Sequence, residues 1–268
     1  MNLNVFTKTQ VMGILNVTPD SFSDGGQFDN IEKALARAKQ MLKDGASIID
    51  VGGESTRPGH TQISDEEEIA RVVPVIQALR EQTEAIISID TYKSAVAQAA
   101  VEAGAHIIND IWGAKYDPEI ARVAADKQVP IILMHNRAEA VYDDFLHDAK
   151  KDLEVSIRIA HDAGVSDNHI WLDPGIGFAK TLAQNVEMMQ RLDDLVAMGY
   201  PVLLGTSRKS FIGKLLDAQV DERLEGSLAT AAFGVMKGCQ IVRVHDVKET
   251  VQTVKMMDFL TGKIKVEG

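Results

Sequence analysis

The chain has 268 residues, 45% of them hydrophobic and 25% charged, a composition typical of a folded globular protein and not of a disordered one. Its formal net charge of −11 argues against a general nucleic-acid binder, and any anionic substrate must therefore be held by local cations. No apolar segment approaches the ~18 residues that span a bilayer. The N-terminal "MNLNVFTKTQ" lacks a signal-peptide pattern, and the single cysteine, Cys239, suits a reducing cytoplasm.

Eight short apolar runs recur along the chain. Each is nearly continuous in Ile, Val and Leu, which predicts parallel strands that are buried on both faces. In chain order the runs are "VMGILN" (11–16), "SIIDVG" (47–52), "IISID" (86–90), "HIIND" (106–110), "PIILMH" (130–135), "IWLDPG" (170–175), "PVLLGT" (201–206) and "IVRVHD" (241–246).

Helical patterns fill the intervals between these runs. The first is expected to start at Asn30 as its N-cap and to stop at Gly45. A second begins at "SDEE" (64–67), which has capping-box spacing, and Pro74 is expected to kink or shorten it. A third covers 91–104, and Asp117 is the expected cap of a fourth. Longer helical stretches follow near 141–163, 181–198, 221–237 and 247–260.

Strand and helix therefore alternate eight times, which requires crossover connections and a parallel sheet. Eight such units in about 250 residues predict an α/β fold, a single-domain (β/α)8 TIM barrel. No "GxGxxG" follows the first run, which disfavours the doubly wound dinucleotide fold. We expect one domain over residues 1–268, with 1–10 as a short N-terminal lead-in.

Polar side chains follow the runs, at the strand ends where chemistry occurs in such barrels. A single Asp or Asn there is often only a turn former, and Asp110 has that character, whereas Asp50 is a candidate buried packing partner. The polar side chains at the strand ends are expected to converge at one end of the barrel, its mouth, and this convergence favours a binding site over turn formation alone. The acceptors and amides suit an aminopyrimidine-like edge and the cations suit an anion; they are Asp90, Asn109 and Asp173, and Arg57, Lys209, Arg243 and His245.

Eight blocks in the same order make the sequence resemble the dihydropteroate synthases from about residue 11 to 260. The blocks are "GILNVTPDSFSDGG" (13–26), "DVGGESTRPG" (50–59), "SIDT" (88–91), "IINDIWG" (107–113), "LMHN" (133–136), "LDPGIGFAK" (172–180), "LLGTSRKSFIG" (203–213) and "RVHDV" (243–247). The resemblance implies a bacterial, cytoplasmic, homodimeric enzyme of folate biosynthesis and a sulfonamide target. Its reaction would join 4-aminobenzoate to 6-hydroxymethyl-7,8-dihydropterin diphosphate and release diphosphate.

The resemblance also implies roles for single residues. Asp90, Asn109, Asp173 and Lys209 would hold the pterin, and Thr56, Arg57, Arg243 and His245 would contact the diphosphate. Asn16 would help to ligate Mg²⁺. Ser210 would receive the aminobenzoate carboxylate, with Pro58 and Phe178 lining its slot. The catalytic residues would be Asp90, Asp173, Lys209 and Arg243.

Three alternatives remain at this stage. A pterin-binding methyltransferase would share the acidic edge but would not need the cation cluster. A phosphate-binding aldolase or decarboxylase barrel would need a Schiff-base lysine or a carbanion site, and Lys209 within "TSRKS" favours binding over imine formation. From a different class, the chain could be a non-catalytic pterin-binding module. Diphosphate release that depends on 4-aminobenzoate would separate them.

Overall fold

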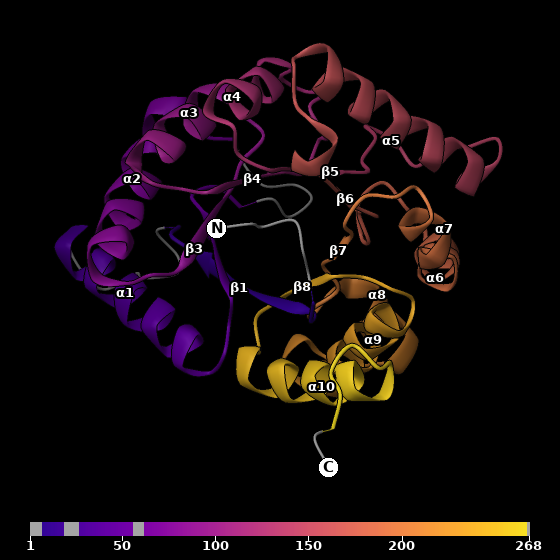
Figure 1. Ribbon diagram of the computed structural model, residues 1–268. Helices are drawn as coiled ribbons and strands as arrows, with labels where there is room; N and C mark the ends of the chain where they lie inside the picture. Colours follow the sequence, from indigo (N-terminus) through magenta and orange to yellow (C-terminus); the bar gives the residue numbers. More distant parts are fainter. Residues whose placement is uncertain (1–6, 19–26, 56–61, 267–268) are drawn as a thin grey trace.

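The computed structural model describes residues 7–18, 27–55 and 62–266, and it has the predicted (β/α)8 barrel. Figure 1 shows the strands at the centre of a ring of helices. All strand pairs are parallel, in the order β6-β5-β4-β3-β2-β1-β8-β7. The ring closes between β6 and β7 through a single bridge, in which Leu172 N donates to Pro201 O at 2.8 Å.

The strands coincide with the eight apolar runs. Their bounds are β1 Gln10–Asn16, β2 Ile48–Gly52, β3 Ile86–Asp90, β4 Ile107–Asp110, β5 Ile131–Met134, β6 Ile170–Asp173, β7 Leu203–Leu204 and β8 Ile241–Val244. Only β7 is much shorter than predicted. Pro201 has no N–H to give to a neighbouring strand, which limits regular pairing at the start of that run.

The helices cover the outside of the barrel; α1 to α9 lie between successive strands in sequence, and α10 follows β8. Their bounds are α1 Gln27–Lys43, α2 Asp65–Gln82, α3 Ser94–Ala103, α4 Glu119–Lys127, α5 Phe145–Asp162, α6 Leu182–Gln190, α7 Leu192–Val196, α8 Ser210–Leu216, α9 Leu224–Met236 and α10 Val247–Leu260, with short 3-10 turns η2 Asp167–His169 and η3 Val220–Glu222. Within the described part of the chain, no helix has both the length and the apolar character needed to cross a membrane.

Three predictions about helix ends were wrong. Helix α4 has Pro118 and not Asp117 as its N-cap residue, although the Asp117 side chain accepts from Glu119 N at 3.2 Å. Helix α1 begins at Gln27, so Asn30 lies in its first turn and is not the N-cap. Helix α2 runs unbroken through Pro74 to Gln82. The side chains of Val72, Ile76 and Leu79 are fully buried along one face of α2, and this burial outweighs the backbone hydrogen bond that Pro74 cannot make. The Ser64 cap is confirmed, because its side chain accepts from Glu67 N at 3.2 Å.

An apolar layer fills the inside of the barrel. It consists of one inward side chain from each of seven strands, namely Met12, Ile48, Ile107, Ile132, Trp171, Leu203 and Ile241. A second, larger apolar cluster lies between the strands and the surrounding helices. The inner layer plugs the barrel toward the N-terminal ends of the strands, so any site must lie above it, at the carboxyl ends.

Candidate active site

The polar residues of the mouth lie one layer above the apolar plug. Side chains two residues apart in a strand point to the same face, so the residue that follows an inward apolar residue by two also points inward. In β2, β4, β6 and β8 these next inward residues are Asp50, Asn109, Asp173 and Arg243. The sequence thus changes the barrel interior from apolar to charged within a single step of the strand repeat.

Arg243 is the centre of this polar layer. Its Nε lies 2.6 Å from Asp50 Oδ2, and its Nη2 lies 2.5 Å from Asp90 Oδ2. Asn109 Nδ2 donates to the same Asp50 oxygen at 3.2 Å. The side chains of Asp50 and Asp90 are 0% and 5% exposed, so both carboxylates depend on the guanidinium for compensation. The predicted role of Asp50 as a buried partner is confirmed.

Two acids that share one guanidinium leave an excess negative charge. Burial raises the pKa of Asp90, the Arg243 guanidinium opposes that shift and the Asp50 carboxylate adds to it. Among the described residues, Asp90 Oδ1, Asp50 Oδ1 and Ser88 Oγ are buried without a hydrogen-bond partner. Buried acceptors of this kind are costly unless a donor reaches them, and this points to a ligand that brings N–H groups.

Asp173 and Lys209 form the opposite side of the mouth. Asp173 Oδ1 accepts from Gly175 N at 2.7 Å, and Lys209 Nζ donates to the carbonyl of Ile176. The Lys209 ammonium also lies 4.2 Å from the centre of the Phe178 ring. Burial raises the pKa of Asp173 and lowers the pKa of Lys209 to about 8.

The two sides of the mouth are close together. A methyl group placed on Gly205 would lie 3.9 Å from both Arg243 Cβ and Asp173 Oδ2. The structure therefore brings Asp90, Asn109, Asp173 and Arg243 to one place, with Lys209 beside them, although they come from five different strand ends. When Asp50, the other partner of Arg243, is counted with them and all are ionised, three carboxylates face two cations.

His245 and Ser210 lie at the edge of this group. The backbone N and ring Nδ1 of His245 lie 3.1 and 3.0 Å from Ser207 Oγ, so Ser207 fixes the ring. Ser210 is exposed and is the first residue of α8. The neighbouring Arg208 is already paired with Asp246, with 2.9 Å between Nε and Oδ2.

Asn16 is exposed at the end of β1, and its Oδ1 lies 3.7 Å from a methyl group placed on Gly52, with Asp90 Oδ2 at 3.6 Å from the same point. Residues 7–18, 27–55 and 62–266 contain no group of three or more His, Cys, Asp or Glu side chains suited to a metal ion. Thr56, Arg57 and Pro58 lie outside the described residues.

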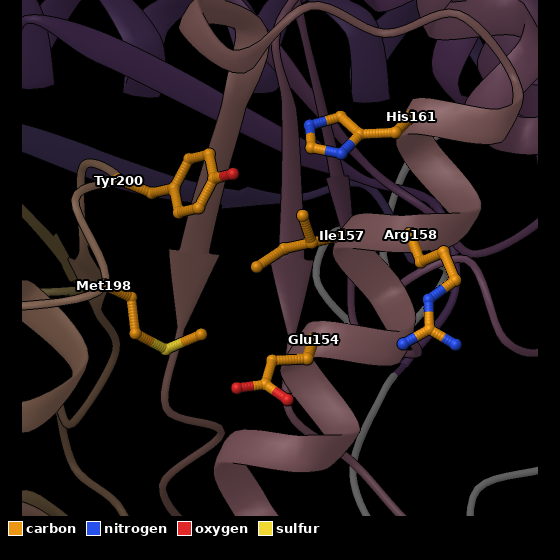
Figure 2. A pocket seen from close by; sticks show the side chains of 6 residues that line it. All are labelled: Glu154, Ile157, Arg158, His161, Met198 and Tyr200. Carbon is orange, nitrogen blue, oxygen red and sulfur yellow. The ribbon is translucent and has the colours of Figure 1, made fainter.

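A surface hollow of about 410 Å³ lies far from these side chains (Figure 2). It is lined by the C-terminal half of α5 and by Met198 and Tyr200, which precede β7. Both segments lie at the N-terminal ends of the strands, because barrel helices run antiparallel to the strands that they follow. The hollow is therefore at the opposite end of the barrel from the charged mouth.

Comparison with known proteins agrees with this geometry. A model of the pterin-binding enzyme family matches residues 12–245. The dihydropteroate synthase of Bacillus subtilis is 58% identical over 256 residues, covering 96% of this chain and 90% of that protein.

Solved structures give the same result. A dihydropteroate synthase from Clostridium difficile, determined in the presence of pteroic acid, has a TM-score of 0.94 and 47% identity, covering 96% of this chain and 98% of the other. The Yersinia pestis dihydropteroate synthase with a sulfonamide drug complex has a TM-score of 0.89 and 43% identity, covering 97% and 96%. The chain therefore belongs to the pterin-binding enzymes and, within them, to the dihydropteroate synthase family.

Proposed function

We propose that this enzyme condenses 4-aminobenzoate with 6-hydroxymethyl-7,8-dihydropterin diphosphate, giving 7,8-dihydropteroate and diphosphate in folate biosynthesis. The observation that carries the proposal is Asp90 Oδ1, which is buried without a hydrogen-bond partner on a side chain that binds Arg243 in the same mouth as Asp173, in a chain of this family. A pterin edge supplies ring N–H and amino donors for two such acceptors. Pteroic acid, present with the C. difficile relative, contains a pterin joined to 4-aminobenzoate.

Pterin recognition is assigned to the predicted residues Asp90, Asn109, Asp173 and Lys209. Asp173 Oδ1 is occupied by Gly175 N, so its Oδ2 is the oxygen left for the ligand. Two acceptors that approach one ring edge from opposite sides fix its orientation as well as its affinity. The Lys209 ammonium, held between the Ile176 carbonyl and the Phe178 ring, presents a donor to the same ligand.

We propose a dissociative substitution at the pterin methylene carbon. The carbon–oxygen bond to diphosphate breaks, the aminobenzoate nitrogen then bonds to the carbon, and that nitrogen loses a proton. Positive charge develops on the pterin between these steps, and the excess negative charge of the mouth stabilises it more than the neutral ground state. No strong base is needed, because a neutral arylamine is already nucleophilic, so His245 is assigned to phosphate contact.

Diphosphate departure is assigned to Arg243, His245, Thr56 and Arg57. The Nε and one Nη2 hydrogen of Arg243 are bonded to carboxylates, and the remaining guanidinium hydrogens are the donors for a phosphate oxygen. Asn16 fits Mg²⁺, since that ion prefers oxygen ligands, keeps several waters and binds through one or two protein oxygens plus substrate phosphates. Mg²⁺ held there would neutralise charge on the leaving group.

The direct test of this function is diphosphate release measured with and without 4-aminobenzoate. The proposal expects release that rises in proportion to added 4-aminobenzoate, together with formation of dihydropteroate. A pterin-binding methyltransferase or a non-catalytic pterin-binding module would release no diphosphate, and release independent of 4-aminobenzoate would indicate hydrolysis. Either result would exclude the proposed condensation.

A variant of Ser210 tests whether the mouth has separate sites for the two substrates. Ser210→Ala is expected to raise KM for 4-aminobenzoate by about 10–100-fold, because one hydrogen bond to a charged group contributes roughly 1.5–3 kcal/mol. The KM for the pterin diphosphate should stay within about twofold. The resemblance assigns Phe178 and Pro58 to the same slot. Equal losses for both substrates, measured by steady-state kinetics, would show that Ser210 does not belong to a separate aminobenzoate site.

Two further expectations concern assembly and setting. We propose a homodimer, supported by a hollow of about 820 Å³ between α5, α6 and α8. It is lined by five apolar side chains and three polar ones, namely Leu146, Leu182, Ala183, Val186 and Leu215, and Glu187, Gln190 and Arg191. Light scattering that gives one chain per particle would contradict it.

We also propose a cytoplasmic enzyme, in line with its buried free Cys239, and sulfonamide competition with 4-aminobenzoate, as suggested by the Y. pestis relative.

A further inference from the structure

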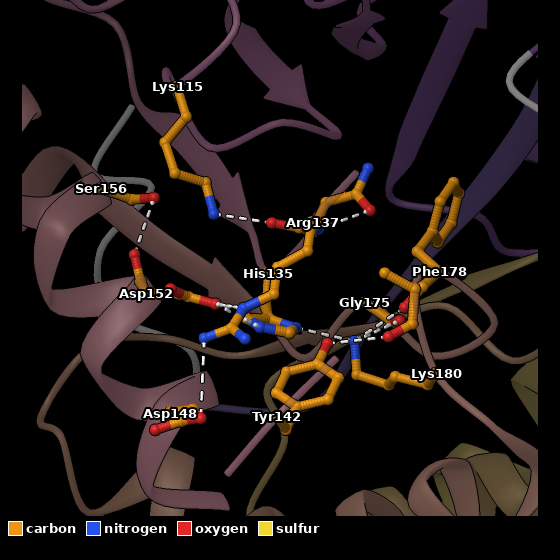
Figure 3. A network of polar contacts seen from close by, with 12 residues as sticks. Lys115, His135, Arg137, Tyr142, Asp148, Asp152, Ser156, Gly175, Phe178 and Lys180 are labelled. Atoms are coloured by element: carbon orange, nitrogen blue, oxygen red, sulfur yellow. Dashed lines mark hydrogen bonds and ion pairs between the residues drawn. The ribbon is translucent and has the colours of Figure 1, made fainter. Parts of the chain in front are cut away.

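A polar network lies directly behind the turn that follows β6 (Figure 3). At its centre is Lys180, whose Nζ contacts three acceptors. It lies 2.7 Å from His135 Nδ1, 2.9 Å from Gly175 O and 3.1 Å from Phe178 O. This lysine is the last residue of the "LDPGIGFAK" block, and no role follows from the strand-end pattern, because it lies seven residues beyond Asp173.

The three acceptors around Lys180 Nζ match the protonated form of its amine. An ammonium group has three N–H donors and no acceptor, so all three contacts are satisfied only when Lys180 carries its proton. His135 must then accept at Nδ1 and donate from Nε2, which lies 3.1 Å from Asp152 Oδ2. Arg137 Nε also binds that carboxylate oxygen, at 2.5 Å. Burial lowers the pKa of His135 to about 4, so the ring stays neutral and keeps this tautomer.

The turn that Lys180 holds carries the pterin-binding groups. Gly175 uses its carbonyl for Lys180 and its N–H for Asp173 Oδ1. Between Gly175 and Phe178, the carbonyl of Ile176 holds Lys209, whose ammonium lies against the Phe178 ring. The peptide groups that bind Lys180 are thus linked directly to both polar side chains on this side of the mouth.

The 174–178 turn has little freedom to move to other hydrogen-bond partners. Gly175 has a φ of +66°, in the left-handed region. A Cβ there would lie 1.9 Å from His135 O, so the turn presses against the end of β5. Lys180 fills the remaining space beside this contact, and removal of its N–H groups would leave the carbonyls of Gly175 and Phe178 without their side-chain donor.

We propose that Lys180 is a positioning residue for the pterin site, which acts through the 174–178 turn to hold Asp173 and Lys209 in the geometry that binds the pterin. The inference rests on the proposed function and deepens it. It assigns Lys180 no contact with either substrate. Its effect should fall mainly on pterin affinity, because the turn holds both Asp173 and Lys209, whereas of the aminobenzoate slot only the backbone carbonyl of Phe178 contacts Lys180.

The same geometry makes pterin binding sensitive to pH. Burial lowers the pKa of Lys180 to about 7, with Asp173 and Asp152 favouring its charged form and Lys209 and Lys115 opposing it. Below pH 7 the ammonium satisfies all three acceptors. Above this value a neutral amine supplies only two hydrogens, so one acceptor loses its donor and pterin affinity should decline.

The test compares Lys180→Met, which keeps all but the last atom of the side-chain length and removes its donors, with Lys180→Arg, which keeps a permanent charge. Calorimetry with 6-hydroxymethylpterin gives pterin affinity, and steady-state kinetics gives both KM values. Lys180→Met is expected to weaken pterin binding by roughly 10–100-fold, the usual effect of losing a residue that orients a ligand-binding group. KM for 4-aminobenzoate should change less than about threefold.

Two results would distinguish positioning from general folding support. In Lys180→Arg, and in Lys180→Ala supplied with propylammonium to replace the missing atoms, pterin affinity should recover. Burial also raises the pKa of Asp90 to about 7, so the readout is the difference between wild type and Lys180→Met: it should be largest below pH 7 and shrink above it. Lys115→Met is the matched control, since Lys115 Nζ donates to Asn136 O at 2.7 Å beside the same network but does not contact the turn. It should bind pterin within threefold of wild type.

Wild-type pterin affinity in Lys180→Met, or parallel losses for pterin and aminobenzoate that propylammonium does not reverse, would overturn the inference. A failure of the proposed function would give a different result from a failure of this inference. If the wild-type enzyme bound pterin but released no diphosphate with 4-aminobenzoate, the condensation would be excluded, while the pterin affinities of the variants would still decide the role of Lys180.

Discussion

Asp173→Asn is expected to lower kcat/KM for the pterin diphosphate by roughly 10²–10³-fold, the usual cost of removing one charge-stabilising contact from a transition state. The substitution is close to isosteric. The carbonyl oxygen of the new amide can still accept from Gly175 N, so the turn keeps its anchor. The NH₂ group of the amide, however, takes the place of Oδ2 and offers a donor where the ligand requires an acceptor. The substitution also removes a negative charge that stabilises the pterin cation.

The measurement is steady-state kinetics with each substrate varied in turn, together with thermal denaturation of the variant. Asp117→Asn is the control, because it makes the same change at a residue assigned to neither substrate, where the two carboxylate oxygens accept from Ser94 N at 2.8 Å and Glu119 N at 3.2 Å. Its kcat/KM should stay within twofold of wild type. A value of kcat/KM within fivefold of wild type for a folded Asp173→Asn enzyme would remove Asp173 from the catalytic residues.

Lys93→Met is expected to reduce the free energy of unfolding by about 3–5 kcal/mol, the usual cost of breaking a buried ion pair from one side. Lys93 Nζ lies 2.7 Å from Glu54 Oε2, 2.8 Å from Glu68 Oε2 and 2.7 Å from Ile63 O. The three charged side chains are 6%, 3% and 1% exposed. Methionine would leave two buried carboxylates without their shared cation.

Urea denaturation measures this loss, and a fall in Tm of about 10 °C should accompany it. Lys127→Met is the matched control, since Lys127 pairs with Glu102 at 2.8 Å but the two side chains are 35% and 52% exposed. Such surface pairs contribute ~1 kcal/mol or less. Adding Glu68→Gln to Lys93→Met should restore part of the stability. A loss in Lys93→Met no larger than in Lys127→Met would contradict this account of the cluster.

The fold was predictable because local sequence patterns specify the strands and helices of the barrel. Buried parallel strands need nearly continuous Ile, Val and Leu, and glycine ends helices such as α3, whose Gly104 has a φ of +117°. The predictions at Pro74 and Asn30 were wrong because the bounds of a helix depend on which of its side chains are buried as well as on local propensity. The burial of Val72 and Ile76 against the barrel was not visible in the sequence.

The location of the mouth was also predictable, since strand order places every carboxyl end on one face. The pairings within it were not. Arg243 was expected to face diphosphate, but two of its nitrogens are bonded to Asp50 and Asp90, which are 193 and 153 residues away in sequence. Strand spacing shows which way a side chain points, but not which partner it meets. Lys180 was missed for the same reason, because its partners are backbone carbonyls and a histidine that follows β5.

A crystal structure of the protein with a dihydropterin and diphosphate bound would test most directly whether the strand-end residues form one pterin site. We expect the pterin edge within ~2.7–3.2 Å of Asp90 Oδ1 and Asp173 Oδ2, with diphosphate beside Arg243 and His245. A pterin bound elsewhere, with Asp90 Oδ1 still lacking a donor, would contradict it.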